Sequence, residues 1–188
     1  VEDQQVDRFQ QKLQDSQAVR YLWSKGHDRI GFLGGEPDSI VTIERKQAYS
    51  DALAELGLVE DPAAVKYGCF SAKGTKKRIL EIAETGVTAV VCISDLLACT
   101  AVKELIRAGY SVPEDISITG YDNLPPSEYS QPPITTLSQN RIHIGKTTFF
   151  MLQQMKNGIH IKSVMLRPEL IERESVREIC SRELPKEK

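Results

Sequence analysis

Hydrophobic and polar positions along the chain fall into two alternating patterns. Short runs that are almost wholly apolar, such as TAVVCI at 88–93, are typical of strands that helices cover on both faces. Longer stretches repeat apolar side chains every three or four positions, which is the period of a helix packed on one side. Because the two patterns take turns, the chain is predicted to form βα units in a doubly wound parallel sheet, an α/β fold.

Glycines and prolines separate the predicted elements, because both end helices and interrupt strands. Strands are predicted at 29–34, 63–68, 88–93 and 116–120. Helices are predicted at 18–25, 41–56, 75–84 and 96–108. Beyond Asp122 the four prolines at 125, 126, 132 and 133 indicate a stiff, irregular crossing. A helix at 142–155 and a strand near 163–170 are predicted to follow.

The last predicted helix has no evident partner in the rest of the pattern. It carries Ile142, Phe149, Leu152 and Met155 on one face. A helix with an apolar face needs another element to cover that face. The sequence therefore predicts one complete α/β lobe together with remnants of a second.

Composition narrows the class of protein. With 188 residues, 40% of them hydrophobic, the chain can bury a sizeable core in about one or two domains. A net charge of −2 gives no general attraction to nucleic acid or to a membrane surface. No segment resembles a signal peptide, and no apolar run is long enough to span a bilayer.

The four cysteines do not indicate a metal or disulfide framework. Cys69, Cys92, Cys99 and Cys180 form no C-x-x-C pair and lie at no metal-ligand spacing to a histidine. We therefore expect reduced thiols in a cytosolic protein, with no metal and no cofactor.

The segment VPEDISITGYDN, Val112–Asn123, contains the clearest sign of a ligand site. Ile116 and Ile118 alternate with polar residues as in a short buried strand, and Asp122 follows where the chain leaves the sheet. In open parallel sheets, ligands bind outside the carboxyl ends of the strands. Asp122 is therefore predicted to face a ligand.

Four other residues follow the ends of the remaining predicted strands. Arg45 lies in the first turns of the helix after the first strand, and Phe70 follows the second. Ser94 and Asp95 come directly after the third. An arginine, an aromatic ring, a hydroxyl and carboxylates around one rim would suit a polar small molecule with hydroxyls and one flat apolar face.

Each of these residues also has an ordinary structural explanation. Arg45 could be a solvated surface side chain and Phe70 a core residue. Ser94 or Asp95 could cap the following helix, a role compatible with facing a ligand. Asp122 could simply form a turn with Asn123.

Catalysis is not indicated by the sequence. It contains no G-x-S-x-G elbow, no P-loop and no G-x-G-x-x-G fingerprint. Asp95 and Asp122 could be imagined as a glycosidase pair, but no residue pattern shows a raised pKa in either carboxyl. We therefore expect a binding protein and not an enzyme.

Several segments together resemble the effector-binding region of the LacI/GalR family of bacterial transcriptional regulators. The matching segments are YLWSKGHDRIGFLGG (21–35), ERKQAY (44–49), TAVVCISDLLA (88–98), GYSVPEDISITGYDN (109–123), PPITTLSQN (132–140) and LRPELIERESV (166–176). The resemblance implies the fold of periplasmic sugar-binding proteins, with two α/β subdomains, three crossover strands and a ligand between them. It also implies that Arg45, Phe70, Ser94 and Asp122 face the effector.

The resemblance gives each site residue an expected role. Arg45 and Asp122 match positions that usually bond hydroxyls or a base edge, and Phe70 matches an aromatic that stacks on the ligand. Asp95 matches an acidic residue that helps at the site or caps the helix. The segment before the first helix resembles the trehalose-repressor branch, a hint toward a disaccharide or a sugar phosphate.

The family pattern also implies a domain organisation. Residues 1–14 would end the N-terminal subdomain and form the first crossover, and 15–137 would be the C-terminal effector-binding subdomain. Residues 138–165 would return to the N-terminal subdomain, and 166–188 would be the final crossover and tail. The DNA-binding headpiece and most of the N-terminal subdomain would be absent, so this fragment should not bind operator DNA by itself.

The expected function is to sense a small sugar or sugar phosphate and to control DNA binding allosterically. The expected partners are the sugar effector and, through the missing N-terminal domain, operator DNA. A cytoplasmic homodimer is expected for the full-length protein, with no membrane contact. The alternative is a sugar-binding protein of a transport system with the same fold.

Overall fold

A six-stranded sheet forms the centre of the computed structural model, which describes residues 16–184 except 69–71, 162–163, 165 and 167. Along the sheet, the strands are β2 (Val65–Lys66), β1 (Ile30–Leu33), β3 (Ala89–Cys92), β4 (Ser117–Tyr121), β5 (Thr135–Ser138) and β6 (Glu169–Ile171). Neighbouring strands are parallel except β5 and β6, which are antiparallel. The predicted α/β class with a doubly wound, mostly parallel sheet is confirmed.

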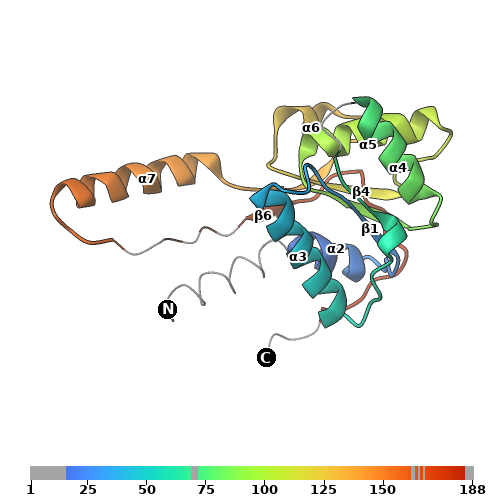
Figure 1. The fold of residues 1–188 in the computed structure, drawn as a ribbon, viewed down its shortest axis with the longest axis horizontal. Helices are drawn as coiled ribbons and strands as arrows, with labels where there is room; N and C mark the ends of the chain where they lie inside the picture. Colours follow the sequence, from blue (N-terminus) through green and yellow to red (C-terminus); the bar gives the residue numbers. More distant parts are fainter. Residues whose placement is uncertain (1–15, 69–71, 162–163, 165, 167, 185–188) are drawn as a thin grey trace.

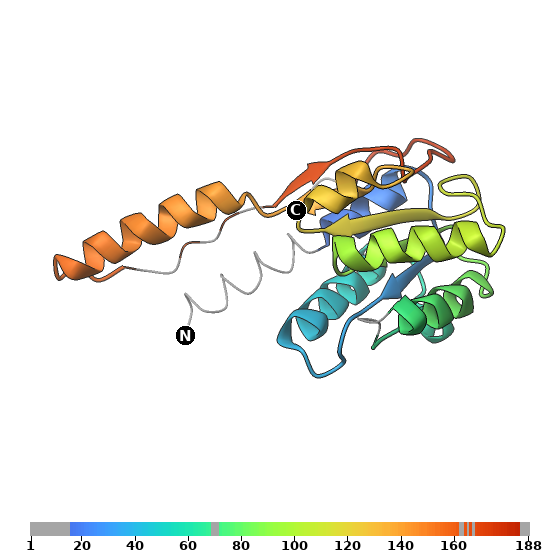
Figure 2. The same cartoon turned by 90° about the horizontal axis from the view of Figure 1, so that it is seen from above.

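Helices cover both faces of the sheet (Figures 1 and 2). One face carries α2 (Gln17–Ser24) and α3 (Ile40–Glu55), and the other carries α4 (Ala72–Ala83), α5 (Asp95–Arg107) and the short α6 (Pro125–Tyr129). A single 3-10 turn, η1 (Pro62–Ala64), precedes β2. Covered on both sides, the strand residues of β1, β3 and β4 are all buried, including the polar Ser117 and Thr119 of β4.

Helix α5 shows how local sequence sets the ends of an element. The Ser94 hydroxyl accepts a hydrogen bond from the Leu97 N–H at 3.3 Å, which caps the first turn. Gly109 follows the last turn with φ +94°, a conformation that favours glycine. The helix therefore begins just beyond the carboxyl end of β3. Its first turn lies at the carboxyl edge of the sheet, the ligand edge, where the sequence predicts a ligand.

The proline-rich crossing is more regular than predicted. Pro125 and Pro126 open α6, because proline is tolerated in the first turn, where its missing N–H has no helical partner. Thr135–Ser138 then joins the sheet as β5, which the sequence did not predict as a strand. Of the strand predicted near 163–170, residues 163, 165 and 167 lie outside the described residues, and the described part forms a strand at Glu169–Ile171. The prediction of an irregular crossing was wrong for 125–129, which is helical, and is confirmed for 130–134, which has no regular secondary structure.

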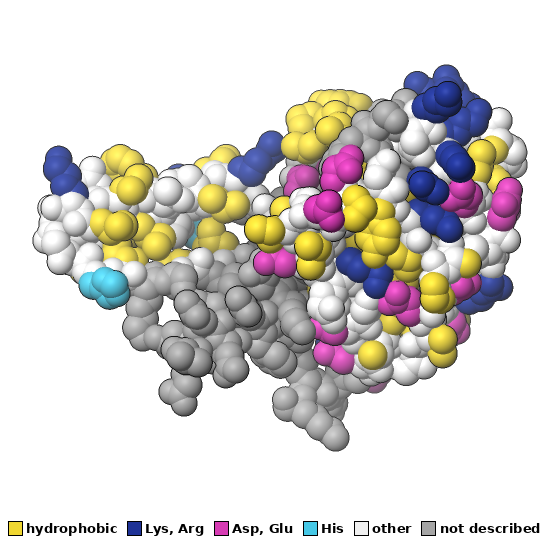
Figure 3. Space-filling model, in the orientation of Figure 1, with side chains coloured by type: hydrophobic (Ala, Val, Ile, Leu, Met, Phe, Trp, Pro, Cys, Tyr) yellow, Lys and Arg dark blue, Asp and Glu magenta, His cyan; other side chains and the backbone are white. Residues whose placement is uncertain are grey.

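Helix α7 (Arg141–Lys156) extends away from the sheet (Figures 1 and 2). None of its described residues is buried, and the exposed fractions of Ile142 and Phe149 are 73% and 66%. Hydrophobic side chains are visible along it in Figure 3. The predicted helix is confirmed, and its apolar side chains have no cover within the described part of the chain. No described helix is both long and apolar enough to cross a membrane.

The segment after β6 passes along the sheet at the end opposite the ligand edge. The Ile118 N–H donates to the Ser175 carbonyl at 2.8 Å, and the Arg177 N–H donates to the Ser117 hydroxyl at 3.0 Å. Further on, the Ile179 N–H donates to the carbonyl of Lys25 at 2.7 Å. These bonds attach 174–182 to β4 and to the end of α2.

Candidate functional site

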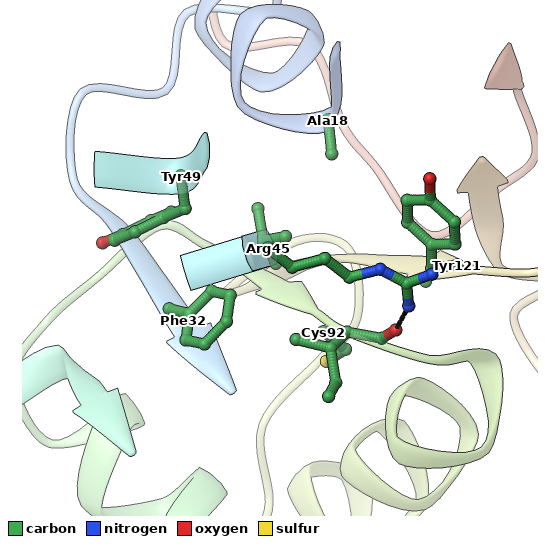
Figure 4. Close-up of a pocket in the computed structure, with 9 residues that line it drawn as sticks. Ala18, Phe32, Arg45, Tyr49, Cys92 and Tyr121 are labelled. Carbon is green, nitrogen blue, oxygen red and sulfur yellow. Dashed lines mark hydrogen bonds between the residues drawn. The ribbon is translucent and has the colours of Figure 1, made fainter. Parts of the chain in front are cut away.

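Arg45 lies on α3, one turn before Tyr49, and reaches to the carboxyl ends of β3 and β4 (Figure 4). Its guanidinium carbon lies 3.4 Å from the centroid of the Tyr121 ring. The guanidinium also donates to the carbonyl oxygen of Ile93. Only 13% of the side chain is exposed, so Arg45 is a built part of the site and not a solvated surface residue.

Asp122 follows β4 directly, as the sequence predicted. Its φ of 103° is rare for a residue with a side chain, and its N–H donates to the Leu137 carbonyl at 2.8 Å. One carboxylate oxygen lies 3.6 Å from a terminal nitrogen of Arg45. Burial raises the pKa of the Asp122 carboxyl above its ordinary value, Arg45 opposes that rise, and the Asp95 charge adds to it.

Asp95 lies next to Asp122 but has a different environment. Its side chain is fully buried, and its two oxygens accept 2.6 Å hydrogen bonds from the Leu124 N–H and the Thr136 hydroxyl. Burial raises the pKa of this carboxyl, while these hydrogen bonds lower it. Both oxygens are thus bonded within the protein, an arrangement that supports a structural role at the base of the site.

Ser94 and Phe70 complete the set of predicted site residues. Ser94 is the N-cap of α5, so its hydroxyl is already bonded to a backbone N–H of the helix. It lies at the same edge of the sheet as Arg45 and Asp122. Phe70 lies outside the described residues, and its predicted stacking role stays a prediction.

The sequence reasoning missed Tyr121. Its ring forms the flat surface on which the Arg45 guanidinium lies, and only 5% of the residue is exposed. Alternation along β4 places Ser117, Thr119 and Tyr121 on one face, which was the available signal. Beneath the guanidinium is a small pocket (Figure 4), lined by Ala18, Phe32, Arg45, Tyr49, Val91, Cys92, Ile93, Gly120 and Tyr121.

The arrangement suits recognition of hydroxyl groups. Arg45 offers several N–H donors in one plane, and Asp122 offers acceptor oxygens beside it. Their separation of 3.6 Å is longer than a hydrogen bond, so each keeps bonding capacity for a third group. A ligand hydroxyl can accept from Arg45 and donate to Asp122 at the same time.

A fold of this kind, with polar side chains at the carboxyl ends of its strands, is typical of small-molecule binding domains. The family model that matches residues 19–176 is the periplasmic binding protein-like domain. The chain belongs to that family. Its resemblance to the effector-binding region of LacI/GalR-family regulators is borne out by the relatives.

Among those relatives is the HTH-type transcriptional repressor CytR of Escherichia coli (strain K12). It is 35% identical over 164 residues, which cover 85% of this chain and 48% of the repressor. The chain spans about half the length of the curated relatives it matches. These relatives are repressors and not enzymes, in line with the expectation of a non-catalytic domain.

Solved structures agree with the sequence comparison. The crystal structure of the Escherichia coli transcriptional repressor AscG has a TM-score of 0.82 and 27% identity, covering 89% of this chain and 62% of that one. The complex of the transcriptional regulator CelR with cellobiose has a TM-score of 0.78 and 31% identity, covering 88% and 52%. Both support the periplasmic-binding-protein-like fold of the lobe.

Proposed function

We propose that this chain is the effector-binding part of a transcriptional regulator that senses a small sugar or sugar phosphate. The observation that carries the proposal is the Arg45–Asp122 pair, held against Tyr121 at the carboxyl ends of β3 and β4. Contacts with the Tyr121 ring, the Ile93 carbonyl and Asp122 fix the position of the Arg45 guanidinium. A polyhydroxyl compound matches the pair, because adjacent hydroxyls each donate and accept.

A sugar is favoured as the effector by the chemistry of the rim and by the relatives. One solved relative is a complex with cellobiose, a disaccharide. The trehalose-repressor resemblance of the first segment points in the same direction. The predicted stacking of Phe70 would supply an apolar surface for one face of a sugar ring.

Control of DNA is proposed for the whole regulator and not for this lobe alone. The domain organisation at 15–137, 138–165 and 166–188 would put the effector between this lobe and a second subdomain. Effector binding would then change the population of closed forms and, through it, the affinity for operator DNA. We place the regulator in the cytoplasm, where it meets DNA, and expect it to act as a homodimer.

The first experiment is a thermal-shift screen of the intact regulator with cellobiose, trehalose, trehalose 6-phosphate and glucose 6-phosphate. A sugar that raises the melting temperature is then titrated by calorimetry into Asp122→Asn and Arg45→Met. Each substitution should weaken binding by about 10- to 100-fold, since hydrogen bonds to charged groups are worth about 1.5–3 kcal/mol.

Asp28→Asn is the matched control, because Asp28 pairs with Arg182 away from the ligand edge. It should leave the sugar affinity unchanged. Circular dichroism should show that all three variants are folded. Unchanged titrations for Asp122→Asn and Arg45→Met would refute the site assignment, and a regulator insensitive to all four compounds would refute the proposed ligand class.

A further inference from the structure

The turn that carries Asp122 is held in part by the residue that follows it. Asn123 has φ +51°, so two successive residues with side chains adopt positive φ. Such a turn persists only where surrounding contacts fix it. The Asn123 side chain supplies these contacts with both of its polar atoms.

The first contact of Asn123 comes from the segment that follows β6. A terminal nitrogen of Arg173 donates to the Asn123 side-chain oxygen at 2.7 Å. The other terminal nitrogen of Arg173 donates to the Ile134 carbonyl at 2.7 Å and to the Ser127 hydroxyl at 3.3 Å. The Arg173 N–H itself donates to the Thr135 hydroxyl at 3.0 Å. These other bonds therefore fix the Arg173 guanidinium independently of its bond to Asn123.

The second contact of Asn123 is with the segment that leads from β5 into α7. The Asn123 side-chain nitrogen donates to the Ser138 hydroxyl at 3.4 Å, at the end of β5. Arg141, the first residue of α7, donates to the Asn123 carbonyl at 3.5 Å. Asn123 thus touches both segments that connect α7 to the sheet, the outgoing one at 138–141 and the returning one at 173.

We propose that Asn123 and Arg173 act as one unit that positions Asp122 and links its carboxylate to both segments that join α7 to the sheet. Arg173 holds Asn123, and Asn123 holds the left-handed turn at whose first residue the carboxylate stands. A shift of Asp122 toward a ligand moves the same turn and therefore strains the hydrogen bonds of Asn123 to Ser138 and Arg173. This positioning role rests on the proposed function, because it takes Asp122 to be a residue that binds the effector.

The test measures hydrogen exchange by NMR in the 188-residue chain, without ligand. Asn123→Gly removes the side chain but keeps positive φ accessible, and Arg173→Met removes the donor without touching the turn. Each should speed exchange of the Asp122 N–H by about ten-fold, relative to the amides of β3. The double variant should be no faster than the faster single variant, since residues that act as one unit are not additive.

Arg182→Met is the control, because Arg182 lies further along the same segment and pairs with Asp28. It should leave exchange of the Asp122 N–H unchanged. Arg173→Lys keeps the charge but not the planar pair of donors, and should rescue only part of the protection. Equal acceleration of the Asp122 and β3 amides would overturn the proposal, as would additive effects of the two substitutions.

A second arm separates this unit from the proposed ligand. Cellobiose is titrated into the intact regulator and into its Asn123→Gly variant, which should bind about ten-fold more weakly. If the unmodified regulator does not bind cellobiose, that sugar is rejected as the ligand while the exchange result still decides the positioning role. If cellobiose binds both proteins equally, the unit does not position Asp122 for binding.

Discussion

At the scale of single residues, two neighbouring carboxylates divide the work at the ligand edge. Asp95 is fully buried and bonds the Leu124 N–H and the Thr136 hydroxyl. Asp122 lies further out on the rim, with 35% of its side chain exposed and one carboxylate oxygen 3.6 Å from a terminal nitrogen of Arg45. Asp95 thus fixes the loop that follows β4, while the Asp122 carboxylate is the more accessible of the two.

His27 gives the chain a pH-dependent stability. It is fully buried, with one ring nitrogen 2.9 Å from the Thr88 hydroxyl and the other 3.1 Å from the Arg177 carbonyl. Burial is the main cause of its lowered pKa. As the pH falls below about 6.5, the unfolded chain takes up this proton before the folded chain does. The contribution of His27 to the free energy of unfolding should therefore be fully present above that pH and decline below it.

Urea unfolding between pH 7.5 and pH 5 would measure this dependence of the free energy of unfolding. The His27→Gln variant should lose that part of the decline which His27 causes. The exposed His143 serves as the control, so His143→Gln should follow the unmodified chain. Equal slopes for the unmodified chain and His27→Gln would show that His27 does not titrate on unfolding.

At the scale of elements, close contact between β4 and α5 requires glycine at position 120. A Cβ atom there would lie 2.3 Å from a carboxylate oxygen of Asp95 and 3.3 Å from the Cβ of Ala98. Gly120→Ala should therefore lower the free energy of unfolding by about 1–3 kcal/mol. Chemical denaturation would measure the loss.

The control for this substitution is Gly145→Ala, in the middle of α7. Apart from the neighbouring backbone of α7 itself, no atom of the described residues lies within 4 Å of the Cβ that it would add, and alanine favours a helix more than glycine does. Gly145→Ala should not destabilise the chain. A Gly120→Ala variant as stable as the unmodified chain would mean that Asp95 moves without cost.

Helix α7 should affect association more than stability. Phe149 and Phe150 are 66% and 61% exposed, so Phe149→Gln should change the free energy of unfolding by less than about 0.5 kcal/mol. It should also reduce self-association in sedimentation velocity experiments, because exposed apolar surface favours contact between molecules. By contrast, Phe32→Ala in the buried β1 should cost about 3–5 kcal/mol. A large loss of stability in Phe149→Gln would show that α7 packs on the lobe.

Residue patterns predicted most elements but not their assembly near the prolines. The runs that became β1 to β3 are mostly apolar, and the run that became β4 alternates apolar and polar residues. Each has a glycine or proline close by, so their strand character is local. β5 reads TTLS, and its two buried threonines are explained only by partners distant in sequence, Asp95 and Arg173. Arg45 and Asp122 could be predicted because each follows the end of an evident strand. Tyr121 had only the weak signal of alternation along β4, and Arg173 had none, because its partners are distant in sequence.

At the scale of the whole molecule, the segment after β6 fastens two strands of the sheet. The buried Ser175 hydroxyl accepts from the Thr135 N–H at 2.8 Å and donates to the Ile118 carbonyl at 2.6 Å. Ser175→Ala would leave a buried N–H without that partner, and should cost about 2 kcal/mol in the free energy of unfolding.

Urea denaturation would measure that cost, with Ser181→Ala as the control at an exposed position of the same segment. The control should be neutral. If the two variants are equally stable, the Ser175 hydroxyl contributes nothing to the attachment of this segment.

Strands β5 and β6 form an antiparallel pair at the edge of the sheet, and the segment between them, which contains α7, could be removed from the lobe. Ser138, the last residue of β5, lies directly opposite Glu169, the first residue of β6. The chain that leaves the sheet therefore returns to the same place, and about two residues in a tight hairpin turn would span the gap. A short turn could therefore join β5 directly to β6, and the lobe without α7 could be studied as a small autonomous domain.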